Sequence, residues 1–373
     1  MKGGRHMRIK LIHTADLHGG HLSTGGGFRG DTGSLRRREI LASLQHICET
    51  ATAENADFLL ISGDLAEETM QEQDWDKISG MFEQIAPIRV IWSRGEADWN
   101  APVRKWPANV YGLEPGFHRL DFPDKNTVIW AESWGKESWP EGFYEYIPAA
   151  GPDQFHLLMV HGETEGQVHP IDMNALKSLG ADYCALGHRH KMTIWGREDD
   201  VWAAYPGSPE PLEYSEEGDH GFLVVTLEKG EDYQIRSVKR RICAKRKAVK
   251  QIVTVHSEHD LQGIIDQIRE AFAPQMRQRD LCQAVLKGSR KSFTPLDTWQ
   301  MIQQLTPEEF LFLDVVDETQ PELDLDKLRE ANAENLLGKY IGLMQIQIKA
   351  ASGEKERKTL EAALAAGVEA LMK

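Results

Sequence analysis

Five short motifs in the sequence carry side chains that commonly bind metal ions. They are "TADLHGG" with Asp16 and His18, "SGDLAEE" with Asp64, "RGEADW" with Glu96 and Asp98, "MVHGET" with His161, and "LGHRH" with His188 and His190. Each motif alone is a weak signal, because a Gly-Asp pair or a single histidine occurs by chance in many proteins. Together they are informative, since burying so many carboxylates and imidazoles without a cation would cost several kcal/mol. A centre of two metal ions that share Asp64 accounts for these motifs.

Each motif follows a short apolar run that we expect to be a β-strand. The predicted strands are Ile9–His13, Phe58–Ser62, Ile88–Trp92, Thr127–Glu132, His156–Val160 and Tyr183–Leu186, with helices from about Leu35 and over Asp74–Ile85. Ligands of open α/β sheets gather beyond the carboxyl ends of the strands, so the motifs should converge there. Asp16 and His18 lie two apart on a segment expected to be extended, which would point both side chains the same way.

The rest of the chain extends this α/β pattern. Further strands are expected at Met192–Trp195, Val201–Tyr205, Phe222–Leu227 and Tyr233–Val238, where a second sheet could pack on the first. Beyond Lys250 a smaller unit alternates strands and helices, with strands at Ile252–Val255, Leu281–Leu286 and Phe310–Val316, and Glu356–Met372 is expected to be helical. We therefore predict domains over residues 8–245 and 250–350, followed by a helical segment over residues 354–373.

The composition limits the function classes that fit the chain. A net charge of −15 over 373 residues argues against a simple nucleic-acid binder, because phosphate contacts dominate DNA affinity. One stretch reverses this balance and contains Arg236, Lys239, Arg240, Arg241, Lys245, Arg246, Lys247 and Lys250 without an acid. It is either a solvated surface or a strip that contacts phosphates, and the sequence favours neither.

Neither membrane segments nor disulfides are expected. No apolar run of about 18 residues is present, and the N-terminus lacks the apolar core of a signal peptide, so we expect a cytoplasmic protein. The four cysteines are scattered without CxxC spacing and are expected to be reduced structural residues.

The order of the motifs resembles the calcineurin-like metallophosphoesterase superfamily, which carries Asp-x-His, Gly-Asp, Gly-Asn-His-Asp, His and Gly-His-x-His. Within it the chain resembles the SbcD-type DNA double-strand-break repair exonucleases, also through "AAYPGSPEPLEYSEEGDHGF" at Ala203–Phe222. The resemblance spans roughly Arg8 to Leu227. It implies two packed β-sheets flanked by helices, a small α/β cap domain that helps to hold DNA, and an SbcC-like coiled-coil ATPase partner near the C-terminal helices. Members of the family commonly form homodimers.

The resemblance also implies a ligand set and a reaction. One ion would be held by Asp16, His18, Asp64 and His190, and the other by Asp64, Glu96, His161 and His188. Manganese is the usual ion of the family, and a site with oxygen and nitrogen donors would also accept iron, zinc or cobalt. The implied activity is that of a DNA exonuclease or endonuclease, in which a metal-activated hydroxide attacks the phosphodiester, with Asp64, Asp98 and His161 as catalytic residues.

One motif departs from the family pattern, because Gly95-Glu96-Ala97-Asp98 stands where Gly-Asn-His-Asp is expected. Glu96 keeps an oxygen donor, but Ala97 cannot replace a histidine that contacts the scissile phosphate. Losing such a group typically costs about 10²- to 10⁴-fold in rate.

Three interpretations of this departure stay open. The chain is a nuclease that relies on its metals or on a substitute such as His21 or Arg94, an impaired metal-binding subunit of an ATPase complex, or a phosphoesterase for small molecules or proteins. His169 and Glu163 also lie near motifs and are expected beside the ligands or at the surface.

Overall fold

The computed structural model describes residues 6–21, 31–135, 147, 151, 153–166, 169–197, 199–231, 233–291, 295–306, 309–322 and 324–372. The chain divides into two compact units. The first unit comprises Met1–Lys250, Pro274–Cys282 and Glu309–Asp314, and the second comprises Gln251–Ala273, Gln283–Glu308 and Val315–Lys373.

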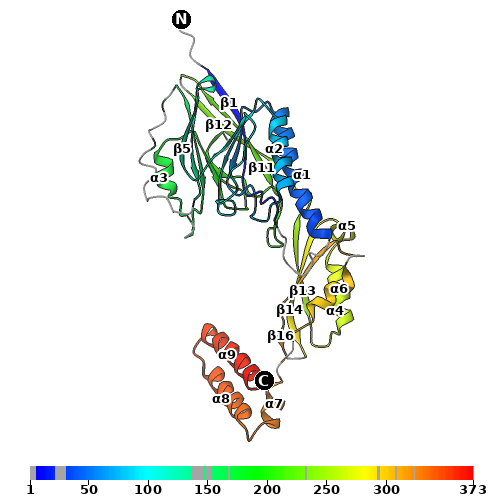
Figure 1. The fold of residues 1–373 in the computed structure, drawn as a ribbon. Coiled ribbons are helices and arrows are strands. Elements are labelled where there is room, and N and C mark those ends of the chain that lie inside the picture. The colour runs from blue at the N-terminus through cyan, green and yellow to red at the C-terminus, as the bar shows by residue number, and fades with distance from the viewer. Residues whose placement is uncertain are drawn as a thin grey trace. The chain divides into compact units, whose positions relative to one another are not determined.

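The first unit is built on one twelve-stranded sheet in the order β4-β3-β2-β1-β11-β12-β10-β8-β7-β6-β5, with β9 beside β10 (Figure 1). Its strands are β1 (Met7–Thr14), β2 (Phe58–Ser62), β3 (Arg89–Ser93), β4 (Val110–Gly112), β5 (Gly116–Phe122), β6 (Thr127–Ser133), β7 (Phe155–His161), β8 (Tyr183–Gly187), β9 (Thr193–Arg197), β10 (Asp200–Tyr205), β11 (Gly221–Lys229) and β12 (Gln234–Ile242). β10 and β12 register at a single pair of residues, Asp200 and Arg236, so the sheet has two halves that meet at this seam.

A core of apolar side chains lies between the two halves. Leu11 of β1 and Leu60 of β2 contribute to it from one half, and Leu157 of β7 and Ala185 of β8 from the other. β2 is parallel to both of its neighbours and entirely buried, which explains why Phe58–Ser62 reads as a continuous apolar run. The predicted fold class is confirmed, and the two packed sheets are the halves of one curled sheet.

Helices cover the outer faces of the sheet. They are α1 (Asp31–Ala53), α2 (Glu72–Gln84) and α3 (Met173–Ser178), with a 3₁₀ helix, η1 (Pro123–Lys125), between β5 and β6. Figure 1 shows α1 and α2 along one side of the strands and α3 on the other. Leu44 of α1 and Phe82 of α2 pack in one outer cluster, and Leu176 of α3 packs in the second. The two helices predicted in this region are confirmed, whereas β4, β5 and α3 are additional.

A second, four-stranded sheet follows along the chain, in the order β13-β14-β15 with β16 beside β14. Its strands are β13 (Ala248–Val255), β14 (Leu281–Arg290), β15 (Phe312–Asp317) and β16 (Gln320–Pro321), and the helices are α4 (Leu261–Ala271), α5 (Pro274–Arg277), α6 (Thr298–Leu305), α7 (Leu325–Ala331), α8 (Leu336–Ala350) and α9 (Glu354–Met372). Ile341 of α8 packs with Leu364 and Val368 of α9, so these helices share one apolar cluster. β13 passes through Lys250, and the domain boundaries given above stay predictions.

Four of the eight cations in the basic stretch are paired with acids. The pairs are Arg236 with Asp200, Arg241 with Glu54, Arg246 with Glu39, and Lys247 with Asp219. A guanidinium or ammonium group that already has a carboxylate partner has less to gain from a phosphate. The structure therefore favours a solvated, acid-paired surface over a strip that contacts phosphates.

The cysteines match the expectation from their spacing. Cys48, Cys184, Cys243 and Cys282 are all buried and free. Within the described ranges, no helix is both long enough and apolar enough to cross a membrane.

Candidate metal centre

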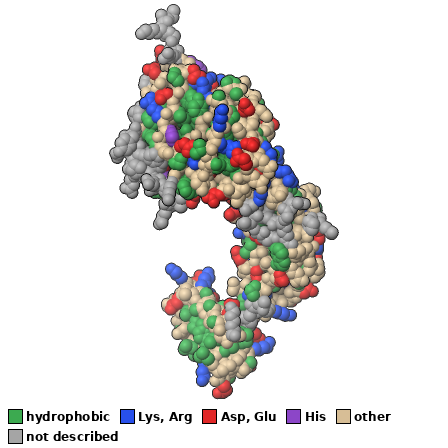
Figure 2. All heavy atoms as spheres, viewed as in Figure 1, with side chains coloured by type: hydrophobic (Ala, Val, Ile, Leu, Met, Phe, Trp, Pro, Cys, Tyr) green, Lys and Arg blue, Asp and Glu red, His purple; other side chains and the backbone are tan. Residues whose placement is uncertain are grey.

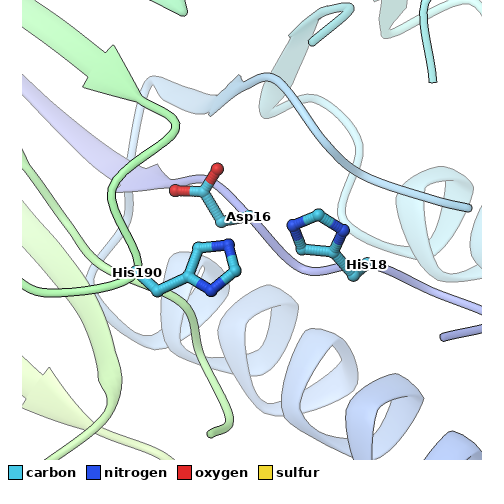
Figure 3. A group of neighbouring side chains, drawn as sticks. All are labelled: Asp16, His18 and His190. Carbon is cyan, nitrogen blue, oxygen red and sulfur yellow. The ribbon is translucent and has the colours of Figure 1, made fainter. Parts of the chain in front are cut away.

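The last residue of β7 and the loops that follow β1, β2 and β8 bring metal-binding atoms together at the carboxyl ends of these strands. Two groups have donor atoms within 4.8 Å of one another. One group is Asp16, His18 and His190, and the other is Asp16, Asp64 and His161. Figure 3 shows the first group, with Asp16 and His18 on the segment after β1 facing His190 from the loop after β8. The predicted convergence is thus seen for five of the seven expected ligands.

Asp64 belongs to the second group and also approaches His18 of the first group. Its Oδ2 atom is 3.6 Å from Nε2 of His18 and 3.3 Å from Nε2 of His161. Its Oδ1 atom accepts a hydrogen bond of 2.8 Å from the backbone nitrogen of Ala97. These distances support the prediction that Asp64 is shared by two ions.

Several of these donors have no hydrogen-bond partner among the described residues. They are Oδ2 of Asp16, Nε2 of His18 and Nε2 of His161, and all three atoms are buried. Leaving a buried polar atom unpaired costs about 1–3 kcal/mol, more for a charged group. Carboxylate oxygens and imidazole nitrogens are donors that a divalent transition metal satisfies, so the site fits the two-ion centre inferred from the sequence.

Oxygen atoms behind the centre orient its histidines. The acceptors are Glu67 for His18 Nδ1 at 2.9 Å, the Ser62 carbonyl for His161 Nδ1 at 2.9 Å, Glu163 for His188 Nε2 at 3.1 Å and Glu216 for His190 Nδ1 at 2.7 Å. A hydrogen bond on one ring nitrogen fixes the tautomer and leaves the other nitrogen for a metal ion. The carboxylates of Glu67 and Glu216 were not anticipated in this role; the only signal for Glu67 was its place in the "SGDLAEE" motif.

The backbone of the site is strained. Four of the expected ligands have positive φ angles, namely Asp16 at 54°, His18 at 50°, Asp64 at 51° and His188 at 104°. Residues other than glycine adopt this region at a cost of about 1–3 kcal/mol each, and they cluster at functional sites. The segment that carries Asp16 and His18 is therefore not extended, which corrects the expected reason for their convergence. Left-handed turns of the loop, and not strand alternation, bring the two side chains together.

Two glycines leave the space that the ligands occupy. A Cβ atom on Gly63, whose φ is 90°, would overlap the ring of His161, and a Cβ atom on Gly95 would overlap the carboxylate of Asp64. Glycine is required at both positions by close approach, and at Gly63 also by its backbone conformation.

Glu96 and His188 lie at the rim of the centre. Neither belongs to the two donor groups within the described residues. Oε2 of Glu96 is 4.0 Å from Nδ1 of His188, and the Glu96 side chain is 57% exposed. Their assignment to the second ion stays a prediction.

Asp98 connects two of the loops. Its Oδ2 atom accepts a hydrogen bond of 2.7 Å from the Leu65 backbone nitrogen, and its Oδ1 atom accepts one of 2.7 Å from the Gly95 backbone nitrogen. Burial, with the nearby charge of Asp64, raises the pKa of Asp98 to about 6. Because both oxygens are bonded to backbone amides, the structure gives Asp98 a positioning role, and the catalytic role expected of it stays a prediction.

The two substitutes considered for the missing histidine are also engaged elsewhere. The buried guanidinium of Arg94 donates to the carbonyl oxygens of Leu113, Trp99 and Ala101 and pairs with Glu114. Nδ1 of His21 lies 3.3 Å from Oε1 of Glu67. Arg94 is therefore a structural residue, and His21 belongs to the carboxylate contact behind His18.

Protons compete with cations for this centre. Burial lowers the pKa of His161, but the carboxylates of Asp64 and Asp16 outweigh it and raise the pKa to about 10. Burial likewise opposes protonation of His190, while Glu216 and Asp16 raise its pKa to about 9. In the absence of a metal ion the imidazoles thus hold protons where ions would bind, so metal binding must release protons.

Comparisons with known proteins agree with this geometry. Residues 9–192 match the family model described as "Calcineurin-like phosphoesterase". The chain is 26% identical over 241 residues to "Uncharacterized metallophosphoesterase YhaO" of Bacillus subtilis (strain 168), covering 60% of this chain and 58% of that protein. It is 24% identical over 273 residues to "DNA double-strand break repair protein Mre11" of Methanopyrus kandleri, covering 60% of this chain and 55% of that protein. The chain thus spans a little over half the length of these curated relatives.

Among solved structures, the chain is similar to a dimetal phosphatase from Danio rerio. The TM-score is 0.40 at 12% sequence identity, and the match covers 61% of this chain and 98% of that one.

Proposed function

Because residues 9–192 form a calcineurin-like metallophosphoesterase domain, we propose that this chain is a phosphodiesterase that uses two divalent metal ions to cleave DNA. The observation that carries the proposal is the pair of donor groups that share Asp16 and leave buried ligand atoms without partners. The similarity to the Mre11 protein of Methanopyrus kandleri supports a DNA substrate and a role in DNA repair.

The side chains of the centre have distinct parts in this proposal. Asp16, His18, Asp64 and His190 would hold one ion, and Asp64, Glu96, His161 and His188 the other. When bound, the ions polarise the phosphodiester and supply a water of lowered pKa for in-line attack. Glu67 and Glu216 hold two of the histidine rings in place, and Asp98 fixes the loops that carry Asp64 and Glu96. We propose manganese as the ion, with iron, zinc or cobalt as substitutes.

Exposed apolar side chains on the C-terminal helices support the proposal that a partner protein binds there. On α8, Leu336, Leu343 and Ile346 are 68%, 57% and 67% exposed. Figure 2 shows hydrophobic side chains gathered in the part of the molecule that contains α8 and α9. The exposed residues are seven and three positions apart, which is the spacing of a coiled-coil seam. We propose that the coiled coil of an SbcC-like ATPase covers this surface.

A second candidate function is a phosphoesterase for small molecules. A cavity of about 290 Å³ lies beside Ala97, and Glu67, Glu68, Glu72 and Asp98 are among the residues that line it. Acids at this position repel the flanking phosphates of a nucleic acid more than a substrate with a single phosphate group.

An assay with three substrates distinguishes the candidates. Linear DNA, bis-p-nitrophenyl phosphate and p-nitrophenyl phosphate are incubated with Mn²⁺-loaded protein, and the Asp64→Asn variant is the control. Cleavage of both diesters without the monoester supports the DNA nuclease, whereas monoester cleavage without DNA cleavage supports the second candidate. Silence toward all three substrates, with two ions bound, would refute both and leave a metal-binding subunit.

A further inference from the structure

Glu132, near the end of β6, is a buried carboxylate with no role in the ligand set. It is fully buried, and neither of its oxygens has a hydrogen-bond partner among the residues that the structure describes. The Nδ1 atom of His169 lies 3.2 Å from Oε1 of Glu132. A buried carboxylate without hydrogen bonds destabilises the folded state. A functional role would therefore explain the pair of Glu132 and His169 better than a contribution to stability.

His169 is fixed beside the loop that carries His161. Its ring packs on the ring of Trp134 at 4.3 Å between centroids, and Nε1 of Trp134 donates a hydrogen bond of 2.7 Å to the carbonyl oxygen of His161. The backbone of His169 has a φ of 49°, and its carbonyl oxygen accepts a hydrogen bond of 3.3 Å from the nitrogen of Glu163. Its side chain is 19% exposed, so the ring is accessible to solvent.

These contacts place His169 next to the expected ligands of the second ion. One neighbour, Trp134, is bonded to His161, and another, Glu163, is bonded through its side chain to His188. The ring of His169 therefore lies one intervening residue away from both His161 and His188, on the side of the expected second ion. A carboxylate that faces one nitrogen of an imidazole orients the ring for proton transfer through the other nitrogen.

We propose that His169 is the general acid of this site, positioned by Glu132, and that it takes the part of the histidine that Ala97 replaces. The inference rests on the proposed phosphodiesterase function. In the step, an oxygen of water forms the new bond to phosphorus and releases one proton to solvent, and the bond from phosphorus to the leaving alcohol breaks. The electron pair of that bond goes to the leaving oxygen, and His169 transfers a proton to it; solvent then returns the proton to His169.

The protonation of the pair suits a proton donor. Burial raises the pKa of Glu132 to about 8, and burial together with the charges of His161 and His188 lowers the pKa of His169. At neutral pH these directions place the proton on Glu132, so His169 gives its own N–H proton to the leaving oxygen while Glu132 supplies a proton to Nδ1 of the ring.

Dependence on the leaving group tests the proposal. A general acid matters for an alkoxide leaving group, as in thymidylyl-thymidine, and little for p-nitrophenolate. His169→Gln should slow cleavage of the dinucleotide by about 10²-fold or more and that of bis-p-nitrophenyl phosphate by less than threefold. Glu132→Gln should show the same selectivity with a smaller loss, and His118→Gln, on the exposed part of β5, is the matched control. Equal losses on both diesters, or no loss on either, would overturn the proposal.

A rescue experiment separates a chemical role from a structural one. If His169 takes the part of the missing ring, Ala97→His in the His169→Gln background should restore at least a tenth of the dinucleotide activity. Metal content, measured by inductively coupled plasma mass spectrometry, should be the same in all of these variants. A loss of metal in His169→Gln would show that the residue supports the ligand loops instead.

Histidine NMR gives a readout that needs no turnover. With ¹⁵N-labelled histidines and Mg²⁺- or Zn²⁺-loaded protein, inorganic phosphate should shift the His169 resonance, and Glu132→Gln should change its titration. If the wild type cleaves no diester, the proposed function fails, yet a phosphate-dependent shift of His169 would still support its place at the phosphate. An unmoved resonance would overturn the inference even in an active enzyme.

Discussion

The carboxylate of Glu67 should control the affinity of the centre for its first ion. Oε1 of Glu67 accepts from Nδ1 of His18 at 2.9 Å and lies 3.3 Å from Nδ1 of His21. Glu67→Gln keeps the shape of the side chain and removes its charge. The ring of His18 then loses the anionic acceptor that holds Nε2 toward the ion and makes the ring a stronger ligand.

The size of the effect follows from the electrostatics of Glu67. Hydrogen bonds from His18 and His21 lower its pKa from 4.5 to about 2, which corresponds to about 3 kcal/mol in favour of the charged form. The side chain is 28% exposed, and solvent screening reduces this to roughly half. This energy refers to protonated rings; for the neutral ring of a metal-bound His18, losing a carboxylate partner typically weakens the Kd by about tenfold or more, which is about 1.4 kcal/mol.

Calorimetric titration with Mn²⁺ measures this change. Glu67→Gln should weaken one of the two binding events about 10- to 30-fold and leave the other within threefold. Glu68→Gln is the matched control, because the neighbouring side chain is exposed and bonds only to the amide of Asn100 among the contacts described. An unchanged Kd in Glu67→Gln, or an equal loss in Glu68→Gln, would refute the reasoning.

Three further predictions concern other side chains. Asp64→Asn should remove at least one ion and reduce diester cleavage at least 10²-fold, because Asp64 lies within 3.6 Å of two imidazole nitrogens; two ions by elemental analysis would contradict its shared role. Ala97→His should raise DNA cleavage about tenfold or more in the His169→Gln background and by less than threefold when His169 is present; no gain in the metal-loaded double variant would show a remodelled site. Glu132 has a folded pKa of about 8 against 4.5, so the folded state keeps its proton longer than the unfolded chain does, and stability falls as pH rises between these values. Urea unfolding from pH 5 to 9 should therefore show that Glu132→Gln gains stability over the wild type with rising pH, by up to about 4 kcal/mol; a constant difference would argue against a buried, protonated Glu132.

The elements with the strongest local signals could be predicted from the sequence. β2 has the predicted bounds, Phe58–Ser62. A parallel strand that is buried on both faces reads as a continuous apolar run, which is easy to recognise in the sequence. β5 was missed, since this edge strand is only partly buried and its sequence, GFHRLDF, alternates weakly. α8 was also missed, because it exposes several of its apolar residues and contains two glycines.

The residue types of the centre could be predicted, but its geometry could not. Asp16, His18, Asp64, His161 and His190 were identified by their motifs, and the structure brings them together. The positive φ angles of Asp16, His18 and Asp64 could not be predicted from the sequence. The packing of the whole loop imposes this strained conformation, and no local sequence pattern encodes it. For Glu132 the sequence predicted only that it lies in a strand. A single acid in an apolar run does not indicate which residues surround it in the folded protein.

The seam in the large sheet gives the bound ions a mechanical consequence. One half of the sheet joins the other through a single registered residue pair between β10 and β12. Asp16 and Asp64 follow strands of one half, whereas His161 ends β7 and His190 follows β8 in the other half. Ions held by both sets would cross-link the two halves at this end of the sheet, and removing the ions should destabilise this end before the opposite one. The domain would then lose this cross-link and its candidate metal centre in the same event.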